Sequence, residues 1–135
     1  MKLLVCIEMR NGILFNHRRV SQDRVVTEDI LKESEGKLWI GEYSRSLFKE
    51  QSSCELKVDD EYRKKAGSEE WCFVETELDS EIAKNTDELV VYQWNRRYPA
   101  DTFMKLDLKE WEELSQEELK GFSHEKITKI RYRKK

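Results

Sequence analysis

Two short stretches of this chain concentrate side chains that can bind an anion. Asn16-His17-Arg18-Arg19 and Asn95-Arg96-Arg97-Tyr98 each place two adjacent arginines among other polar groups, and Asp101 follows the second stretch. A guanidinium group binds carboxylates and phosphates through paired hydrogen bonds. The alternative is that both stretches are exposed loops whose arginines pair with the abundant acids of the chain, as surface ion pairs commonly do.

Two acids belong to a predicted helix. The apolar spacing over residues 25–31 favours a helix that Ser21 caps at its start and Gly36 ends. Asp23 then lies in the first turn, where a negative charge suits the helix dipole. Asp29 lies further along. On this evidence Asp23 is a helix-start acid and Asp29 a solvated surface residue.

The histidines of this chain match no known metal or catalytic motif. The chain has two histidines, His17 and His124, and no HxHxDH string, so it lacks the ligands of a two-zinc phosphodiesterase. Ser123-His124-Glu125 invites comparison with a catalytic triad, but no GxSxG motif accompanies it. We therefore interpret these three residues as surface or strand-start positions and expect no metal site.

The composition indicates one small, strongly ionic domain. The 135 residues include 39% charged side chains with a net charge of −3, and the mean hydropathy is −0.84. Nearly balanced charge gives no general attraction to nucleic acid or to anionic membranes. The basic tail, residues 131–135, is too small for a nucleic-acid interface. Residues 1–135 are expected to form a single domain.

The cysteines and the amino terminus favour a cytoplasmic protein. Cys6, Cys54 and Cys72 are far apart, form no CxxC and are odd in number. Cys6 and Cys72 lie in apolar runs, which is typical of structural thiols. The first apolar run is too short for a signal peptide and no run reaches membrane-spanning length.

Short apolar runs mark the strands of the expected sheet. Strands separated by helical segments in the first part of the chain predict parallel pairing, and strands crowded at the end predict an antiparallel edge. A further helix is expected from Asp59-Asp60 to Gly67, after a polar break at residues 51–53. The expected strands or extended segments are residues 3–7, 38–41, 54–58, 71–74, 89–92, 103–108, 111–114 and 127–132.

Several of these strings resemble dihydrofolate reductases. Residues 85–92, 98–104 and 108–115 are similar to that family's "adeLyl" strand, "gDTfFP" loop and "W…vs" strand. Leu38-Trp39-Ile40-Gly41 resembles "viMGr", and residues 127–134 resemble the family's last strand. The resemblance spans nearly the whole chain. It implies an α/β, dihydrofolate reductase-like fold: a central, mostly parallel sheet with an antiparallel C-terminal edge and flanking helices. The family's third strand would be missing around residues 50–53.

The departures from the family fall where it binds its cofactor. In the family a Gly-Gly pair follows the strand that corresponds to residues 71–74, and an Arg follows the glycine that corresponds to Gly41. Glu75 and Thr76 replace the pair, and Glu42 replaces the Arg. Carboxylates repel a diphosphate, and added Cβ atoms block its approach. We therefore predict no cofactor, with NADPH bound only if the reductase reaction survives. The predicted degenerate cofactor site comprises Gly41, Glu42, Ser44, Glu75 and Thr76.

The resemblance also implies roles for the acids and arginines. The family uses a carboxylate at the start of the first helix to help protonate the pterin. Asp23 has that helical position, Asp29 has the better local match, and the spacing does not decide between them. The fold would bring the two arginine-rich stretches to the same end of the sheet. They could form there a basic, aromatic-edged pocket from Arg18, Arg19, Arg96, Arg97 and Asp101.

Three functions follow from the sequence, in order of preference. The first is a non-catalytic, dihydrofolate reductase-like protein that binds a small anionic ligand or a protein partner. The second is a divergent NADPH-dependent reductase that keeps Asp23 or Asp29 as its acid. The third is a small homo-oligomeric interaction protein, for example a homodimer formed through an exposed sheet edge.

Overall fold

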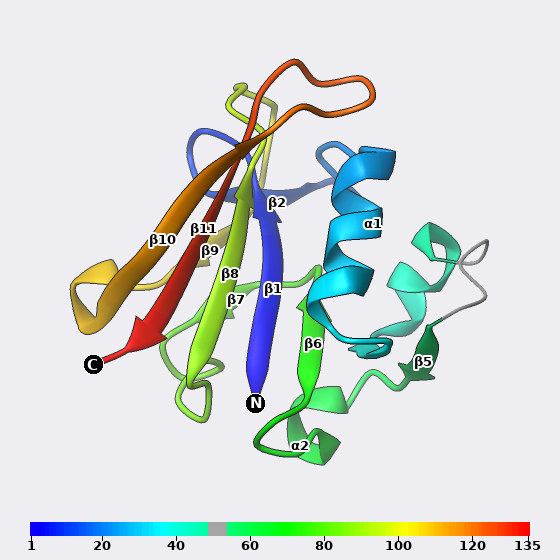
Figure 1. Ribbon diagram of the computed structural model, residues 1–135, viewed down its shortest axis with the longest axis vertical. Coiled ribbons are helices and arrows are strands. Elements are labelled where there is room, and N and C mark those ends of the chain that lie inside the picture. Colours follow the sequence, from blue (N-terminus) through cyan, green and yellow to red (C-terminus); the bar gives the residue numbers. More distant parts are fainter. Residues whose placement is uncertain (49–53) are drawn as a thin grey trace.

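Seven strands form one large sheet through the middle of the molecule (Figure 1). The computed structural model describes residues 1–48 and 54–135. From β8 to β5 the strands are parallel, and β11 runs antiparallel to both β8 and β10. The predicted mostly parallel sheet with an antiparallel C-terminal edge is confirmed. The spatial order is β10 (Trp111–Leu119), β11 (Ile127–Lys134), β8 (Glu88–Gln93), β1 (Lys2–Ile7), β6 (Trp71–Val74), β4 (Lys37–Ile40) and β5 (Glu55–Val58).

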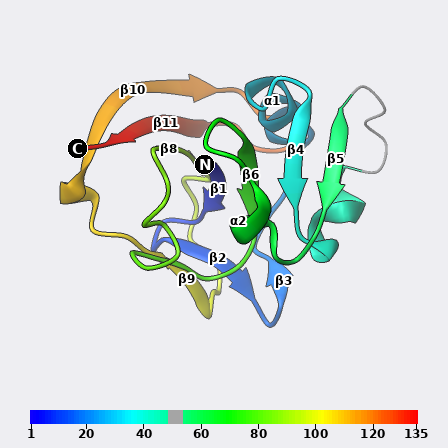
Figure 2. The same ribbon diagram turned by 90° about the horizontal axis from the view of Figure 1, so that it is seen from below.

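Two further layers cover the main sheet (Figure 2). Helix α1 (Arg24–Glu33) packs on one face. On the other face lies a small sheet of β3 (Arg18–Arg19), β2 (Gly12–Phe15), β9 (Thr102–Lys105) and β7 (Leu78–Asp79), in that order. The remaining elements are short: the 3-10 helices η1 (Glu42–Leu47) and η2 (Leu108–Glu110) and the one-turn helix α2 (Tyr62–Lys65).

Alternate residues of the central strands face opposite layers. Leu3 and Val5 of β1 belong to the same core as Met104 of β9, whereas Leu4 belongs to the core that contains Val26 of α1. A strand that is buried on both faces must be apolar at every position. This explains why β1, β6 and β8 appear in the sequence as continuous apolar runs.

The first helix begins later than expected. Asp23 is its N-cap, because the Asp23 carboxylate accepts the backbone N–H of Val25 at 2.9 Å. Ser21 is therefore free to make other contacts. The helix ends at Ser34, two residues before Gly36, whose φ of 84° fits the expected left-handed turn.

Two other expectations need correction or lie outside the structure. The helix expected from residue 59 to Gly67 is reduced to α2, because Ala66 leaves the helical conformation with a ψ of 136°. The polar break at residues 51–53 and the strand thought to be missing around residues 50–53 fall outside the described residues. Among residues 1–48 and 54–135 there is no helix with the length and apolar character needed to cross a membrane.

Candidate functional site

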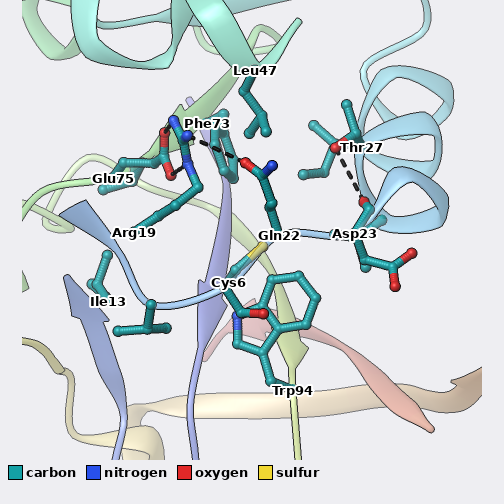
Figure 3. A pocket seen from close by; sticks show the side chains of 15 residues that line it. Cys6, Ile13, Arg19, Gln22, Asp23, Thr27, Leu47, Phe73, Glu75 and Trp94 are labelled. Atoms are coloured by element: carbon teal, nitrogen blue, oxygen red, sulfur yellow. Dashed lines mark hydrogen bonds and ion pairs between the residues drawn. The ribbon is translucent and has the colours of Figure 1, made fainter. Parts of the chain in front are cut away.

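A small cavity lies where the carboxyl ends of β1 and β6 meet α1 (Figure 3). In mostly parallel open sheets this edge is where ligands bind. Cys6 of β1, Phe73 of β6 and Trp94, which follows β8, line the cavity, and Val26 and Thr27 line it from α1. Its volume is about 20 Å³, which accommodates about one water molecule. We call it the closed cavity.

An ion pair between Arg19 and Glu75 forms one wall of the closed cavity (Figure 3). Arg19 Nε donates to Glu75 Oε2 at 2.7 Å and Nη2 donates to Oε1 at 2.9 Å, so the contact is bidentate. The Ser44 hydroxyl donates to the same Oε1 at 2.8 Å, and the guanidinium lies 4.7 Å from the centroid of the Tyr43 ring. Burial alone lowers the pKa of Arg19, but Glu75 raises it above its ordinary value. The charges of Arg19 and Glu75 at this wall are therefore paired with each other.

The thiol in the closed cavity is not activated. Burial raises the pKa of Cys6 well above its ordinary value, and the charge of Glu75 acts in the same direction. Burial also raises the pKa of Cys72 to about 12 and raises that of the half-buried Cys54. Thiols that stay protonated are poor nucleophiles. The environments of all three agree with structural cysteines.

The carboxylate of Asp23 points away from the closed cavity (Figure 3). It accepts the backbone N–H groups of Phe122 at 2.9 Å, Ser123 at 2.8 Å and His124 at 3.1 Å, in addition to the cap bond from Val25. Burial alone raises the pKa of Asp23, but these hydrogen bonds and the His124 side chain lower it well below its ordinary range. An acid that has a lowered pKa and faces the β10–β11 loop is poorly placed to donate a proton into the cavity.

His124 is buried, so its interpretation as a surface residue is wrong. Its Nδ1 lies 2.9 Å from Asp23 Oδ2, and its ring stacks on Trp94 with the ring centroids 4.7 Å apart. The neighbouring Ser123 and Glu125 are exposed. His124 and Asp23 are 101 residues apart in the sequence. A search for local motifs had no means of connecting them.

Asp29 does not line the closed cavity, and its interpretation as a solvated residue is also wrong. Because α1 turns this acid toward the main sheet, its Oδ2 accepts the Tyr92 hydroxyl at 2.6 Å and pairs with Lys129 Nζ at 2.7 Å. Lys129 pairs in addition with Glu33 at 2.6 Å, and Glu33 pairs with Arg131. This network of charges ties α1 to β11 and occupies Asp29 fully.

The predicted degenerate cofactor site is assembled at the ends of β4 and β6. Gly41, Ser44, Glu75 and Thr76 line one pocket of about 170 Å³, which we call the β4–β6 pocket. Glu42, the fifth predicted residue, begins η1 directly after Gly41. Four of the five residues named from the family resemblance therefore lie together, and Glu42 does not line the pocket.

Asp60 is an acid of the β4–β6 pocket that the sequence did not single out. Its Oδ1 accepts the backbone N–H of Glu42 at 2.8 Å. A Cβ on Gly41 would lie 3.0 Å from the same oxygen, so the backbone can approach Asp60 this closely only with little side-chain bulk. Among the described residues that line the pocket, Arg63 is the one cation, and it faces two acids, Asp60 and Glu75.

A wider pocket opens on the other side of β3. It has a volume of about 430 Å³ and we call it the open pocket. Arg18 is exposed beside it, and among the ion pairs of the described residues none involves this arginine. The pocket is lined by Phe15, Asn16, Arg18, Arg19, Val20, Tyr98 and Pro99.

The other members of the predicted basic pocket lie elsewhere or serve the backbone. Arg96 and Arg97 are exposed and do not line the open pocket. Asp101 is exposed too, and its Oδ2 accepts the backbone N–H of Asn16 at 3.0 Å, which holds the turn between β2 and β3. The structure therefore brings together Arg18, Arg19 and Tyr98 from the two predicted stretches, but not their remaining arginines.

Glu8 positions the loop that carries Tyr98, and the sequence analysis missed it. This buried carboxylate accepts the backbone N–H groups of Arg10 at 2.7 Å, Gly12 at 2.8 Å and Tyr98 at 3.2 Å. A Cβ on Gly12 would lie 2.4 Å from Ala100 Cβ, so this close approach requires glycine. An acid at the end of a buried strand with a glycine four residues later was the available signal. Within the described part of the chain, no three acidic, cysteine or histidine side chains gather as a metal site.

Comparisons with known proteins support the fold. No protein-family model and no curated protein sequence matches the chain. Among solved structures, a dihydrofolate reductase from Enterococcus faecalis complexed with NADP(H) and RAB-propyl superposes with a TM-score of 0.66 at 10% sequence identity. The match covers 98% of this chain and 95% of that one. With the strand order and the position of α1, it shows that this chain has a dihydrofolate reductase-like fold, at a sequence distance that makes it a divergent example.

Proposed function

We propose that this protein is a binding module with a dihydrofolate reductase-like fold that does not catalyse dinucleotide-dependent reduction and that takes a small anionic ligand in the open pocket. The observation that carries the proposal is the different use of two adjacent arginines. Arg19 is consumed by Glu75 and closes the cavity beside α1, whereas Arg18 remains available next to a pocket of about 430 Å³.

The residues of the β4–β6 pocket do not fit a dinucleotide. The Enterococcus faecalis reductase is complexed with NADP(H), so the corresponding edge of this chain is the place to test. A diphosphate there would meet the carboxylate of Asp60 and compete with it for the N–H of Glu42, and the adjacent Glu75 is already paired with Arg19. Like charges at short distance in a partly buried site are strongly unfavourable. Only Arg63 would offset them among the described lining residues.

The closed cavity does not fit a pterin either. Pockets that enclose small molecules usually measure about 300–1,000 Å³. The closed cavity offers about 20 Å³. Opening it would require the bidentate Arg19–Glu75 pair to separate, and breaking a buried pair of this kind costs about 3–5 kcal/mol. Asp23, the acid nearest to it, faces the β10–β11 loop.

The open pocket has the chemistry of an anion site with an aromatic rim. Phe15 is 48% exposed, so its ring is available to a planar ligand. Tyr98 supplies a second ring, and its backbone is held by Glu8 and by Arg10 Nη2, which donates to the Tyr98 carbonyl at 3.1 Å. Arg18 supplies the charge that an anion needs. A planar carboxylate or phosphate ester of small size fits these groups.

A homodimer formed through the β10 edge has less support. β10 presents exposed glutamates at Glu112, Glu113, Glu117 and Glu118. Charges on an edge strand oppose pairing with a second strand. Two copies that met edge to edge would bring these acids together, so the ligand-binding proposal takes precedence over the oligomeric alternative.

The proposal is tested by thermal unfolding with a planar anion. Phenyl phosphate is expected to raise the unfolding temperature of the wild type, and phenol, which lacks the charge, is expected to leave it unchanged. At about 100 times the dissociation constant the stabilisation would be about 2.7 kcal/mol. Arg18→Ala should abolish the shift, whereas Arg133→Ala, an exposed arginine on β11, should retain it. If phenyl phosphate still raised the unfolding temperature of Arg18→Ala, the anion would bind at a site other than the open pocket.

The reductase alternative is tested in parallel. We expect excess NADPH, with or without dihydrofolate, to leave the unfolding temperature of the protein unchanged. We also expect the absorbance of NADPH to stay constant when dihydrofolate is present. The Enterococcus faecalis reductase is the positive control. A stabilisation by NADPH in this chain would mean that Asp60 and Glu75 do not exclude the cofactor, and the divergent reductase would become the preferred function.

A further inference from the structure

Ser21 and Asp23, two residues apart in the sequence, both contact the distant His124 beside the closed cavity. Asp23 Oδ2 lies 2.9 Å from His124 Nδ1, and His124 Nε2 lies 2.8 Å from the hydroxyl oxygen of Ser21. The imidazole thus bridges a carboxylate and a serine through its two nitrogens. A catalytic triad is recognised by this geometry and not by the order of its residues in the sequence.

Asp23 has the properties of the orienting carboxylate of a triad. Its side chain is completely buried, and it accepts the backbone N–H of His124 at 3.1 Å as well as the ring Nδ1. Because an ionised carboxylate accepts only, the imidazole carries its proton on Nδ1. This leaves Nε2 as an acceptor for the Ser21 hydroxyl. With Nδ1–H donating to Asp23 and Nε2 accepting from Ser21, the contacts are those of a serine–histidine–carboxylate triad.

The position of Ser21 suits a nucleophile. Ser21 follows β3 and precedes α1, so it lies on a strand-to-helix connection, and its side chain is half-buried at the wall of the closed cavity. In α/β-hydrolases the nucleophilic serine also lies on a strand-to-helix connection, there within a GxSxG motif that this chain lacks. Asp23, two residues later, caps α1 and is held by the β10–β11 loop. The whole connection is thus fixed relative to His124.

One hydrogen-bond donor in this region, Trp94 Nε1, has no partner among the described residues. Trp94 is 2% exposed, lines the closed cavity and stacks on His124. A buried donor without a partner is uncommon and requires explanation. The closed cavity accommodates about one water-sized group, so a single carbonyl oxygen that enters it can accept from this donor. An oxygen atom of a bound acyl group would satisfy it.

The open pocket gives the triad a route to solvent. The hydroxyl of Tyr98 lies 3.4 Å from His124 Nε2, and Tyr98 also lines the open pocket. Arg19 and Val20, which precede Ser21, line both spaces. A ligand in the open pocket would therefore approach the same edge of the imidazole that faces Ser21.

We propose that Ser21, His124 and Asp23 form a nucleophilic site that hydrolyses small acyl esters. The Ser21 oxygen attacks the ester carbonyl, and His124 Nε2 takes the hydroxyl proton. The bond to the alcohol then breaks, and His124 returns the proton to the departing alkoxide. Water attacks the resulting acyl-serine, gives one proton to His124 and releases the carboxylic acid, and the proton returns to Ser21. Each bond and proton is accounted for with water as the only co-reactant.

A structural role for the same contacts predicts a different result. Ser21, His124 and Asp23 also join the start of α1 to the β10–β11 loop, so a loss of stability alone does not separate the two roles. Covalent capture of the serine does, because a hydroxyl that only holds a loop in place is not nucleophilic.

The experiment treats the intact protein with an uncharged fluorophosphonate and locates the adduct by peptide mass spectrometry. We expect one adduct, on Ser21, and none in Ser21→Ala or His124→Gln. Ser115→Ala, an exposed serine of β10, is the matched control and should label as the wild type does. Hydrolysis of p-nitrophenyl acetate should fall by about 100-fold or more in Ser21→Ala. Ser21→Ala removes one oxygen atom, and its circular dichroism and unfolding temperature verify that it folds.

Absence of an adduct, or an adduct that persists in Ser21→Ala, overturns the proposal. The esterase proposal goes beyond the anion-binding proposal, and each can be contradicted without the other. The fluorophosphonate carries no charge and needs no anion site, whereas phenyl phosphate can bind without any nucleophile.

Discussion

The closed cavity and the open pocket lie on either side of β3, and they differ in what the chain has already placed inside them. The closed cavity, with about 20 Å³, is walled by the paired Arg19 and Glu75. The open pocket, with about 430 Å³, has Arg18 at its edge, which pairs with no acid in the described part of the chain. Arg19 lines both spaces, but its guanidinium is held by Glu75, whereas the neighbouring Arg18 lines the open pocket alone.

This difference shows that residue type alone does not identify a binding site. Arg18 and Arg19 are equivalent in the sequence. Glu75, which follows β6, pairs with Arg19, so Arg19 is not available to bind a ligand. The same holds for the acids of α1. Asp23 is held by backbone donors and by His124, while Asp29 is neutralised by Lys129. What remains available for a ligand is decided by partners that are distant in the sequence.

The largest loss of stability is expected when Asp23, beside the closed cavity, is replaced. Asp23→Ala removes the cap of α1 and leaves the N–H groups of Phe122, Ser123 and His124 without their acceptor. Each buried donor left without a partner costs about 1–3 kcal/mol, and these costs add incompletely. We expect the free energy of unfolding, measured in urea, to fall by about 4 kcal/mol. A loss below about 1 kcal/mol would show that the β10–β11 loop does not depend on this acid.

The next effect concerns the ion pair that closes the cavity. Arg19→Met leaves the buried Glu75 with the Ser44 hydroxyl as its one side-chain donor among residues 1–48 and 54–135, and we expect a loss of about 3 kcal/mol. The double variant Arg19→Met/Glu75→Met should regain most of that loss, because no charge is then left unpaired. Chemical denaturation of the wild type, both single variants and the double variant closes the cycle. Additive losses in the double variant would contradict a coupled pair.

The central strands could be predicted from the sequence because a strand that is buried on both faces is a continuous run of apolar residues. Residues 3–7, 71–74 and 89–92 are apolar throughout, and each became a central strand. The position of Glu75 and Thr76 at the end of a central strand was also predictable, because both come directly after β6.

The contacts that define the site were not accessible, because they join distant residues. Arg19 meets Glu75 across 56 positions, and His124 meets Ser21 across 103. Gly121 shows the same limit. A Cβ there would lie 2.6 Å from Asp23 Oδ2, a constraint that only the folded β10–β11 loop creates. Local patterns specify strands and caps, whereas pairing between loops requires the three-dimensional arrangement.

A smaller effect on the closed side follows from pH. The pKa of Asp23 is lowered in the folded protein, so its contribution to stability is complete above about pH 4, the ordinary pKa of aspartate, and is lost as the pH falls toward the folded value. The difference in unfolding free energy between the wild type and Asp23→Asn should therefore shrink in acid. Asp101→Asn, at an exposed carboxylate, is the matched control. A difference that stays constant between about pH 6 and pH 3 would contradict the lowered pKa.

The smallest effect is expected on the open side. Arg18→Ala removes an exposed side chain without an ion pair among the described residues, and surface changes of this kind usually alter stability by less than about 0.5 kcal/mol. The neighbouring Arg19→Met is the internal reference, because it changes the same residue type on the same strand. Urea denaturation of both variants measures the contrast directly. If Arg18→Ala destabilised the protein as much as Arg19→Met, Arg18 would be a structural residue, and the open pocket would lose the charge on which its anion-binding role depends.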